Sequence, residues 1–70
     1  MIRLLHILPF MGLGGTERMV LQLCQARDAD LFDASVAPLD TGPMEREFER
    51  AGIRLWQGAG ALAEALSWSE

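Results

Sequence analysis

Lysine is absent from this 70-residue chain, and cysteine and histidine each occur once. Without lysine the chain cannot supply a phosphate-binding P-loop, because the GxxxxGK[ST] pattern requires that residue. The one cysteine, Cys24, cannot form an internal disulfide, and there is no Cys/His cluster for zinc. We therefore expect no metal site and a reducing compartment.

Positive charge is also scarce. Six arginines stand against ten acidic residues, which gives a formal net charge of -4 at pH 7. Nucleic-acid affinity rests on a concentrated basic surface. We therefore expect no nucleic-acid partner.

Long hydrophobic runs are missing as well. No stretch approaches the roughly 20 apolar residues that cross a bilayer. The apolar N-terminal segment is interrupted by His6 and Pro9, and no small-residue cleavage site follows it, so it is not typical of a signal peptide. We expect a cytoplasmic protein, with membrane contact limited to peripheral contact of a larger parent.

What the chain does contain is an alternation of strand-like and helix-like patterns. The apolar run over 2–8 is typical of a parallel strand covered on both faces. Helical periodicity starts at Thr16, and its expected stripe consists of Val20, Leu23, Cys24 and Arg27. A second strand is expected over 34–39, where Pro38 stops it.

The second half repeats this alternation. A helix of about nine residues is expected after Pro43, with Met44 and Phe48 on its apolar stripe and Gly52 as its C-terminal cap. A strand over 53–56 and a helix starting near residue 61 complete the chain.

The order β-α-β-α-β-α predicts an α/β fold: an incomplete Rossmann-like parallel sheet with strand order 3-2-1, forming one partial domain over residues 1–70. In that order the first strand lies at an edge although its residues are apolar, which favours a fourth strand beside it. We interpret the chain as the N-terminal piece of a larger protein.

The glycine-rich loop "GLGGTER" between the first strand and the first helix is the candidate binding site. It matches the dinucleotide fingerprint GxGxxG at Gly12 and Gly14, but the third glycine position holds Glu17, so NAD or FAD binding is weakly supported. Bare backbone N–H groups of the loop and of the first helical turn, at Gly14, Gly15 and Thr16, suit a phosphate or a sugar hydroxyl. We expect φ > 0 near Gly15, where a branched side chain would clash. An ordinary strand-to-helix turn remains the alternative.

Three other side chains have two interpretations each. Glu17 would repel a nearby phosphate, so it either holds the loop or accepts a hydrogen bond from a hydroxyl. His6 is either a core histidine or a catalytic one. Cys24 favours packing over nucleophilic chemistry, because no base is placed near it. The catalytic residues stay unknown.

Two motifs in order resemble the glycosyltransferase family 4-like N-terminal domain of GT-B enzymes. The first, a strand leading to a Gly-Gly-x-Glu loop, is matched by His6, Pro9, Gly14, Gly15 and Glu17. The second, a Gly-Pro turn before a short acidic helix, is matched by Gly42, Pro43, Ala51, Gly52 and Ile53.

This resemblance implies two Rossmann-like domains facing across a cleft, which transfer sugar with retention of configuration from a nucleotide-sugar donor to a glycan, lipid-linked or small-molecule acceptor. The nucleotide-sugar is a substrate, and no cofactor is implied. The residues carried over are Gly14, Gly15 and Glu17. A C-terminal Rossmann domain that grips the donor has no counterpart in these residues, so the chain alone is predicted to be inactive. The alternatives are a non-catalytic nucleotide- or phosphate-binding Rossmann module and an α/β fragment without activity.

Overall fold

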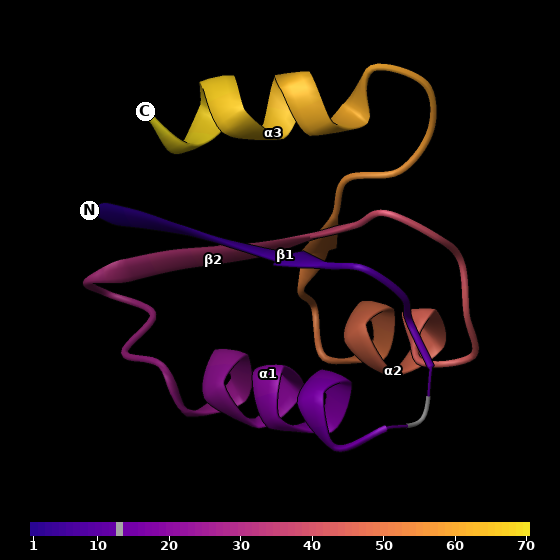
Figure 1. Cartoon of the computed structure of the whole chain (residues 1–70). Coiled ribbons are helices and arrows are strands. Elements are labelled where there is room, and N and C mark those ends of the chain that lie inside the picture. Colours follow the sequence, from indigo (N-terminus) through magenta and orange to yellow (C-terminus); the bar gives the residue numbers. More distant parts are fainter. Residues whose placement is uncertain (13) are drawn as a thin grey trace.

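Strands and helices alternate along the chain in the computed structural model, which describes residues 1–12 and 14–70 (Figure 1). Within this part the elements are β1 (Ile2–Leu8), α1 (Gly15–Ala26), β2 (Phe32–Pro38), α2 (Glu45–Arg50), β3 (Arg54–Leu55) and α3 (Ala61–Ser69). The predicted α/β class is confirmed. None of the helices in the described residues is long and apolar enough to cross a membrane.

The three strands form one parallel sheet in the order β1-β2-β3, so β2 lies in the centre. β1 pairs with the whole of β2, from Ile2 opposite Phe32 to Leu8 opposite Pro38. β3 is shorter than the expected 53–56, because the Ile53 N–H donates to the Phe48 carbonyl (3.0 Å) at the end of α2 instead of joining the sheet.

Helices cover both faces of the sheet: α1 and α2 lie on one side and α3 on the other (Figure 1). The central strand is buried from Ala34 to Ala37. Its side chains alternate, because Ala34 and Val36 belong to the core under α1 and α2, whereas Ala37 belongs to the core under α3. This two-sided burial is what a parallel strand requires.

The edge strand β1 differs from the expectation of two covered faces. Ile2 is 56% exposed and Ile7 is 46% exposed. The reason is geometric: β2 pairs with one edge of β1, and α3 packs against Leu5 but leaves Ile7 open. The prediction that both faces of β1 are covered was therefore wrong.

The first helix also presents a different face from the expected one. Its buried residues are Val20, Leu21 and Cys24, while Leu23 is 55% exposed. Spacings of three and four residues both fit a helix face, so the choice between Leu21 and Leu23 depends on how the helix lies on the sheet.

The second helix is shorter than expected but ends as expected. It covers six residues, since Met44 and Ala51 act as its caps. Gly52 follows with φ of 75°, and its N–H donates to the Glu49 carbonyl (3.0 Å). The predicted glycine cap is confirmed.

The core under α3 contains a buried polar contact. The Trp56 ring N–H donates to the Ser35 hydroxyl over 2.9 Å, and Ser35 is fully buried. Arg54 covers the Trp56 ring at 3.8 Å, and the Trp68 ring lies 5.8 Å away. Arg3 then donates to the Trp68 carbonyl (2.9 Å), which ties the first strand to the last helix.

Candidate functional site

The predicted glycine loop leads into the exposed start of α1. Gly14 is the N-cap residue, with φ of -74° and ψ of 174°, and no side chain caps this end. Gly14, Gly15 and Thr16 are all exposed. Their backbone N–H groups therefore stand at an open helix N-terminus, which carries partial positive charge.

The glycines of this loop differ in how much space surrounds them. A Cβ on Gly12 would lie 2.7 Å from the Phe10 ring, so the chain there is tightly packed. A Cβ on Gly15 would meet nothing within 4 Å, and Gly15 lies inside the helix without a positive φ. The expectation of φ > 0 near Gly15 is wrong, because the loop enters the helix through extended backbone at Gly14.

Glu17 folds back over the start of its own helix. A Cβ placed on Gly14 would lie 2.8 Å from Glu17 Oε2, and Glu17 is half-buried. A carboxylate in this position interacts favourably with the helix dipole. This geometry favours the loop-holding interpretation of Glu17.

The sequence analysis missed the close backbone contact that Gly42 makes. A Cβ there would lie 2.1 Å from the Met11 carbonyl oxygen, a distance that no side chain can tolerate. The same carbonyl accepts a hydrogen bond from the Met44 N–H (2.9 Å). The loop after β2 is thus pressed against the loop after β1 at the carboxyl edge of the sheet.

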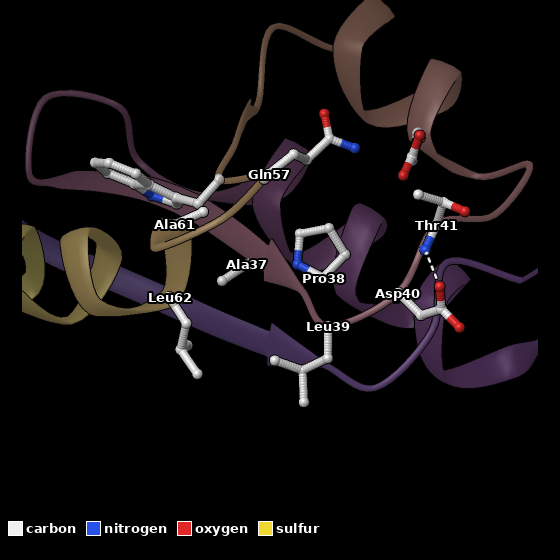
Figure 2. A pocket seen from close by; sticks show the side chains of 11 residues that line it. Ala37, Pro38, Leu39, Asp40, Thr41, Gln57, Ala61 and Leu62 are labelled. Carbon is white, nitrogen blue, oxygen red and sulfur yellow. Dashed lines mark hydrogen bonds between the residues drawn. The ribbon is translucent and has the colours of Figure 1, made fainter.

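Beside this contact the structure holds a pocket of about 310 Å³ at the carboxyl ends of β2 and β3 (Figure 2). It lies between the loop after β2, the start of α2, the turn after β3 and the start of α3. The lining residues are Ala37, Pro38, Leu39, Asp40, Thr41, Glu45, Trp56, Gln57, Gly58, Ala61 and Leu62.

The polar groups of the pocket are acceptor-rich and acidic. Asp40 Oδ1 accepts the Thr41 N–H (2.8 Å), as the dashed line in Figure 2 shows. Glu45 Oε1 is buried and has no hydrogen-bond partner among the described residues. Of the described lining residues, none is basic. The charged side chains of the lining, Asp40 and Glu45, are therefore all acidic.

None of the predicted site residues Gly12, Gly14, Gly15, Thr16 and Glu17 lines this pocket. The two places are nevertheless neighbours, because residues 39–41 line the pocket, and Gly42 and Met44, which follow them, contact Met11 just before the glycine loop. In α/β proteins, ligands bind outside the carboxyl ends of the strands. That rule, applied to the Asp-Thr pair after Pro38, is the signal that could have pointed to the pocket.

The two residues left open by the sequence lie away from the pocket lining. His6 is half-buried and opposite Val36, on the sheet face that α1 and α2 cover. Cys24 is 1% exposed, and its burial raises the pKa of the thiol, an effect that the nearby Arg27 charge partly offsets. A buried thiol with a raised pKa is a packing group rather than a nucleophile.

The described residues contain no group of three or more His, Cys, Asp or Glu that could hold a metal ion.

Comparison of the chain with protein-family models, with curated proteins and with solved structures finds no match.

Proposed function

We propose that this chain is the N-terminal, acceptor-side part of a retaining glycosyltransferase of the GT-B type. The observation that carries the proposal is the pairing of two features at one edge of a parallel sheet. One is the open helix start at Gly14 and Gly15, and the other is the acidic pocket beyond β2 and β3. The sequence resemblance supplies the family, and this pairing is compatible with it.

In this proposal the two features serve different substrates. The N–H groups at Gly14, Gly15 and Thr16 face the diphosphate of a nucleotide-sugar donor and stabilise the negative charge that develops on the leaving group. The pocket holds a glycan, lipid-linked or small-molecule acceptor. Glu17 holds the helix start in shape and does not contact the phosphate, since like charges repel.

The donor site itself is assigned to a second Rossmann-like domain of the parent protein. Nothing among the described residues surrounds a base and ribose, and a few backbone hydrogen bonds contribute about 1 kcal/mol each. Because association itself costs free energy, these hydrogen bonds give a nucleotide diphosphate an affinity of roughly millimolar or weaker. The 70 residues alone are therefore expected to be inactive, and the parent to be a cytoplasmic enzyme.

Isothermal titration of the chain with common nucleotide diphosphates, beside a turnover assay with the corresponding nucleotide-sugars, tests this proposal. We expect weak binding and no transfer. Measurable transfer by the chain would contradict the proposal, because a complete donor site would then exist within these residues.

A second function is a non-catalytic nucleotide- or phosphate-binding module. The exposed, uncapped start of α1 favours it, because a free helix N-terminus attracts anions. Micromolar binding of a nucleotide diphosphate in the same titration would support this alternative over the glycosyltransferase.

A further inference from the structure

We propose that two copies of this chain pair through the outer edges of their β1 strands, which run antiparallel and join the two sheets into one. The inference goes beyond the proposed function and does not rest on it. It depends on the backbone groups that β1 turns outward, on the apolar side chains beside this edge, and on the position of α3.

The hydrogen bonds of β1 show which of its residues face outward. The Ile2 N–H donates to the Leu31 carbonyl (2.8 Å), and the Leu8 carbonyl accepts the Leu39 N–H (2.7 Å) at the other end of the strand. The even-numbered residues of β1 therefore bond toward β2, because the backbone groups of a strand alternate between its two edges. The N–H and C=O groups that point to the outer edge are those of Arg3, Leu5 and Ile7.

The outer edge of β1 offers far more backbone to another strand than the opposite edge of the sheet does. β1 has seven residues, whereas β3 at the other side has two. A charged side chain commonly protects such an edge. In β1 the charged Arg3 is instead turned onto α3, where it donates to the Trp68 carbonyl (2.9 Å). Pairing of two β1 strands leaves the short β3 strands outermost, so assembly stops at two copies.

A two-fold axis at Leu5 gives the register in which all of these outward groups find partners. Leu5 then faces Leu5 of the second copy, and Arg3 faces Ile7. These are the hydrogen-bonded positions of an antiparallel pair, where facing residues exchange both of their N–H···O bonds. Facing residues also lie on the same side of the joined sheet, so Leu5 and Ile7 stay on the α3 side in both copies.

Apolar side chains surround this edge on the α3 side. Ile7, Leu62 and Leu66 are 46%, 38% and 46% exposed, and Leu39 is 57% exposed. Leu62 and Leu66 are four residues apart and therefore share one side of α3. In Figure 2 the Leu39 and Leu62 side chains point toward β1 and away from Gln57. We call Ile7, Leu39, Leu62 and Leu66 the edge surface.

The position of α3 fits the approach of a second copy. The core under α3 includes Leu5 of β1 and Ala37 of β2, so this helix lies over the space between the two strands. Neighbouring strands lie about 4.8 Å apart, which places α3 about one strand spacing from the two-fold axis. The α3 helix of the second copy then lies about 10 Å away on the same side of the sheet, close to the distance typical of packed helices. Leu62 and Leu66 of both copies fill the space between them.

The distribution of charge also favours this face. The chain has a net charge of -4, so two copies repel one another. β1 contains no acidic residue, and Glu64 lies on the side of α3 opposite Leu62 and Leu66. The two-fold axis also keeps the two Arg3 side chains apart, because each faces Ile7.

Sedimentation equilibrium of the full chain over a concentration series tests the inference. We expect a monomer–dimer equilibrium with no larger species. NMR of a mixed sample of isotope-labelled and unlabelled chain tests the register. It should show a contact between the Hα atoms of Leu4 in one copy and His6 in the other, because facing residues without mutual hydrogen bonds lie about 4.5 Å apart at Cα. Within one strand the same two residues lie about 6.7 Å apart.

Variants separate the two parts of the interface. Ile7→Pro removes an outward N–H that the fold does not use, and proline is tolerated at such an edge position. The dissociation constant of the dimer should rise about tenfold or more, whereas Ile7→Val, which keeps the N–H, should change it about twofold or less. Leu62→Gln should raise it about threefold or more through the edge surface. Leu31→Gln is the control, because Leu31 is 56% exposed and lies outside the strands. Amide dispersion shows that each variant is folded.

The inference is overturned if the chain stays monomeric at millimolar concentration, if association continues past two copies, or if Ile7→Val weakens the dimer as much as Ile7→Pro. The first of these outcomes would assign the β1 edge to a strand from elsewhere in the parent protein. The test is separate from that of the proposed function, because no nucleotide or sugar is present.

Discussion

Gly42 and Met11 touch through their backbones, and a Cβ on Gly42 would lie 2.1 Å from the Met11 carbonyl oxygen. Gly42→Ala must therefore push the two loops apart. We expect a loss of about 1 to 3 kcal/mol in the free energy of unfolding, as for other overpacked sites. Urea unfolding measures this, and Gly15→Ala is the control because a Cβ there meets nothing within 4 Å. Equal stability of Gly42→Ala and the original chain would contradict the close contact.

Gly15→Val tests the role of the helix start. Because the site is open and its φ is not positive, the free energy of unfolding should change by about 1 kcal/mol or less. In the active parent enzyme the same change should lower turnover about tenfold or more, since the side chain fills the space of the donor phosphate. Met19→Val, on an exposed position of the same helix, is the control. Unchanged turnover with Gly15→Val would remove the loop from the site.

The buried pair Ser35 and Trp56 should show coupled stability effects. Ser35→Ala leaves the ring N–H without its acceptor, and we expect a cost of about 1 to 3 kcal/mol. Trp56→Phe removes the donor as well as some packing. In a double-mutant cycle followed by urea unfolding, the double variant should lose about 1 kcal/mol less than the sum of the single variants. Strict additivity would mean that this hydrogen bond contributes nothing.

Ionisation of the Cys24 thiol should make the free energy of unfolding depend on pH in the alkaline range. Its pKa is raised in the folded protein by burial, so the folded state holds the thiol proton more tightly than the unfolded chain does. Unfolding then releases a proton, and stability is fully present below the unfolded-state pKa of about 8.5 and falls as pH rises above it. Cys24→Ala should flatten the pH dependence of unfolding in this range. A slope that is the same in both proteins would assign it to other groups.

The outer edge of β1 should make the isolated chain prone to self-association, because a strand that is paired on one edge only and has exposed apolar side chains can pair with another copy. Ile7→Lys places a charge on this edge strand and should lower the associated fraction seen by sedimentation velocity. Leu31→Lys removes an apolar side chain outside the strands that is also about half exposed (56%, against 46% for Ile7), and it should have no such effect. A monomeric chain with a sharp cooperative melt would contradict the prediction.

The sequence was sufficient where one local property decides the structure. Apolar runs located β1 and β2, and the glycine after a short helix located the cap at Gly52, because strand burial and left-handed backbone leave local marks. The sequence was insufficient where contacts with a distant part of the chain decide which side chain is buried. Leu21 and Leu23 are equally apolar, and only the position of α1 on the sheet buries one of them.

The candidate site, too, was predicted only in part from the sequence. The glycine loop was visible in the sequence as a cluster of small residues between a strand and a helix. The pocket was not, because it brings together Asp40, Glu45 and Gln57 from three separate segments. The reason for Gly42 was also hidden, since its neighbour Met11 lies far away in the sequence.

The bond from Arg3 to the Trp68 carbonyl also bears on the order in which the chain can assemble. It joins residues 65 positions apart, and it can form only when nearly the whole sequence is present. The core under α1 and α2 is built from buried residues between Leu8 and Ile53, so it can close earlier, whereas the α3 layer must wait. During synthesis, Ala61 and Leu62 thus reach the sheet after the remaining pocket walls. The pocket thus acquires its shape after the core under α1 and α2, and α3 is the layer whose local opening would expose it again.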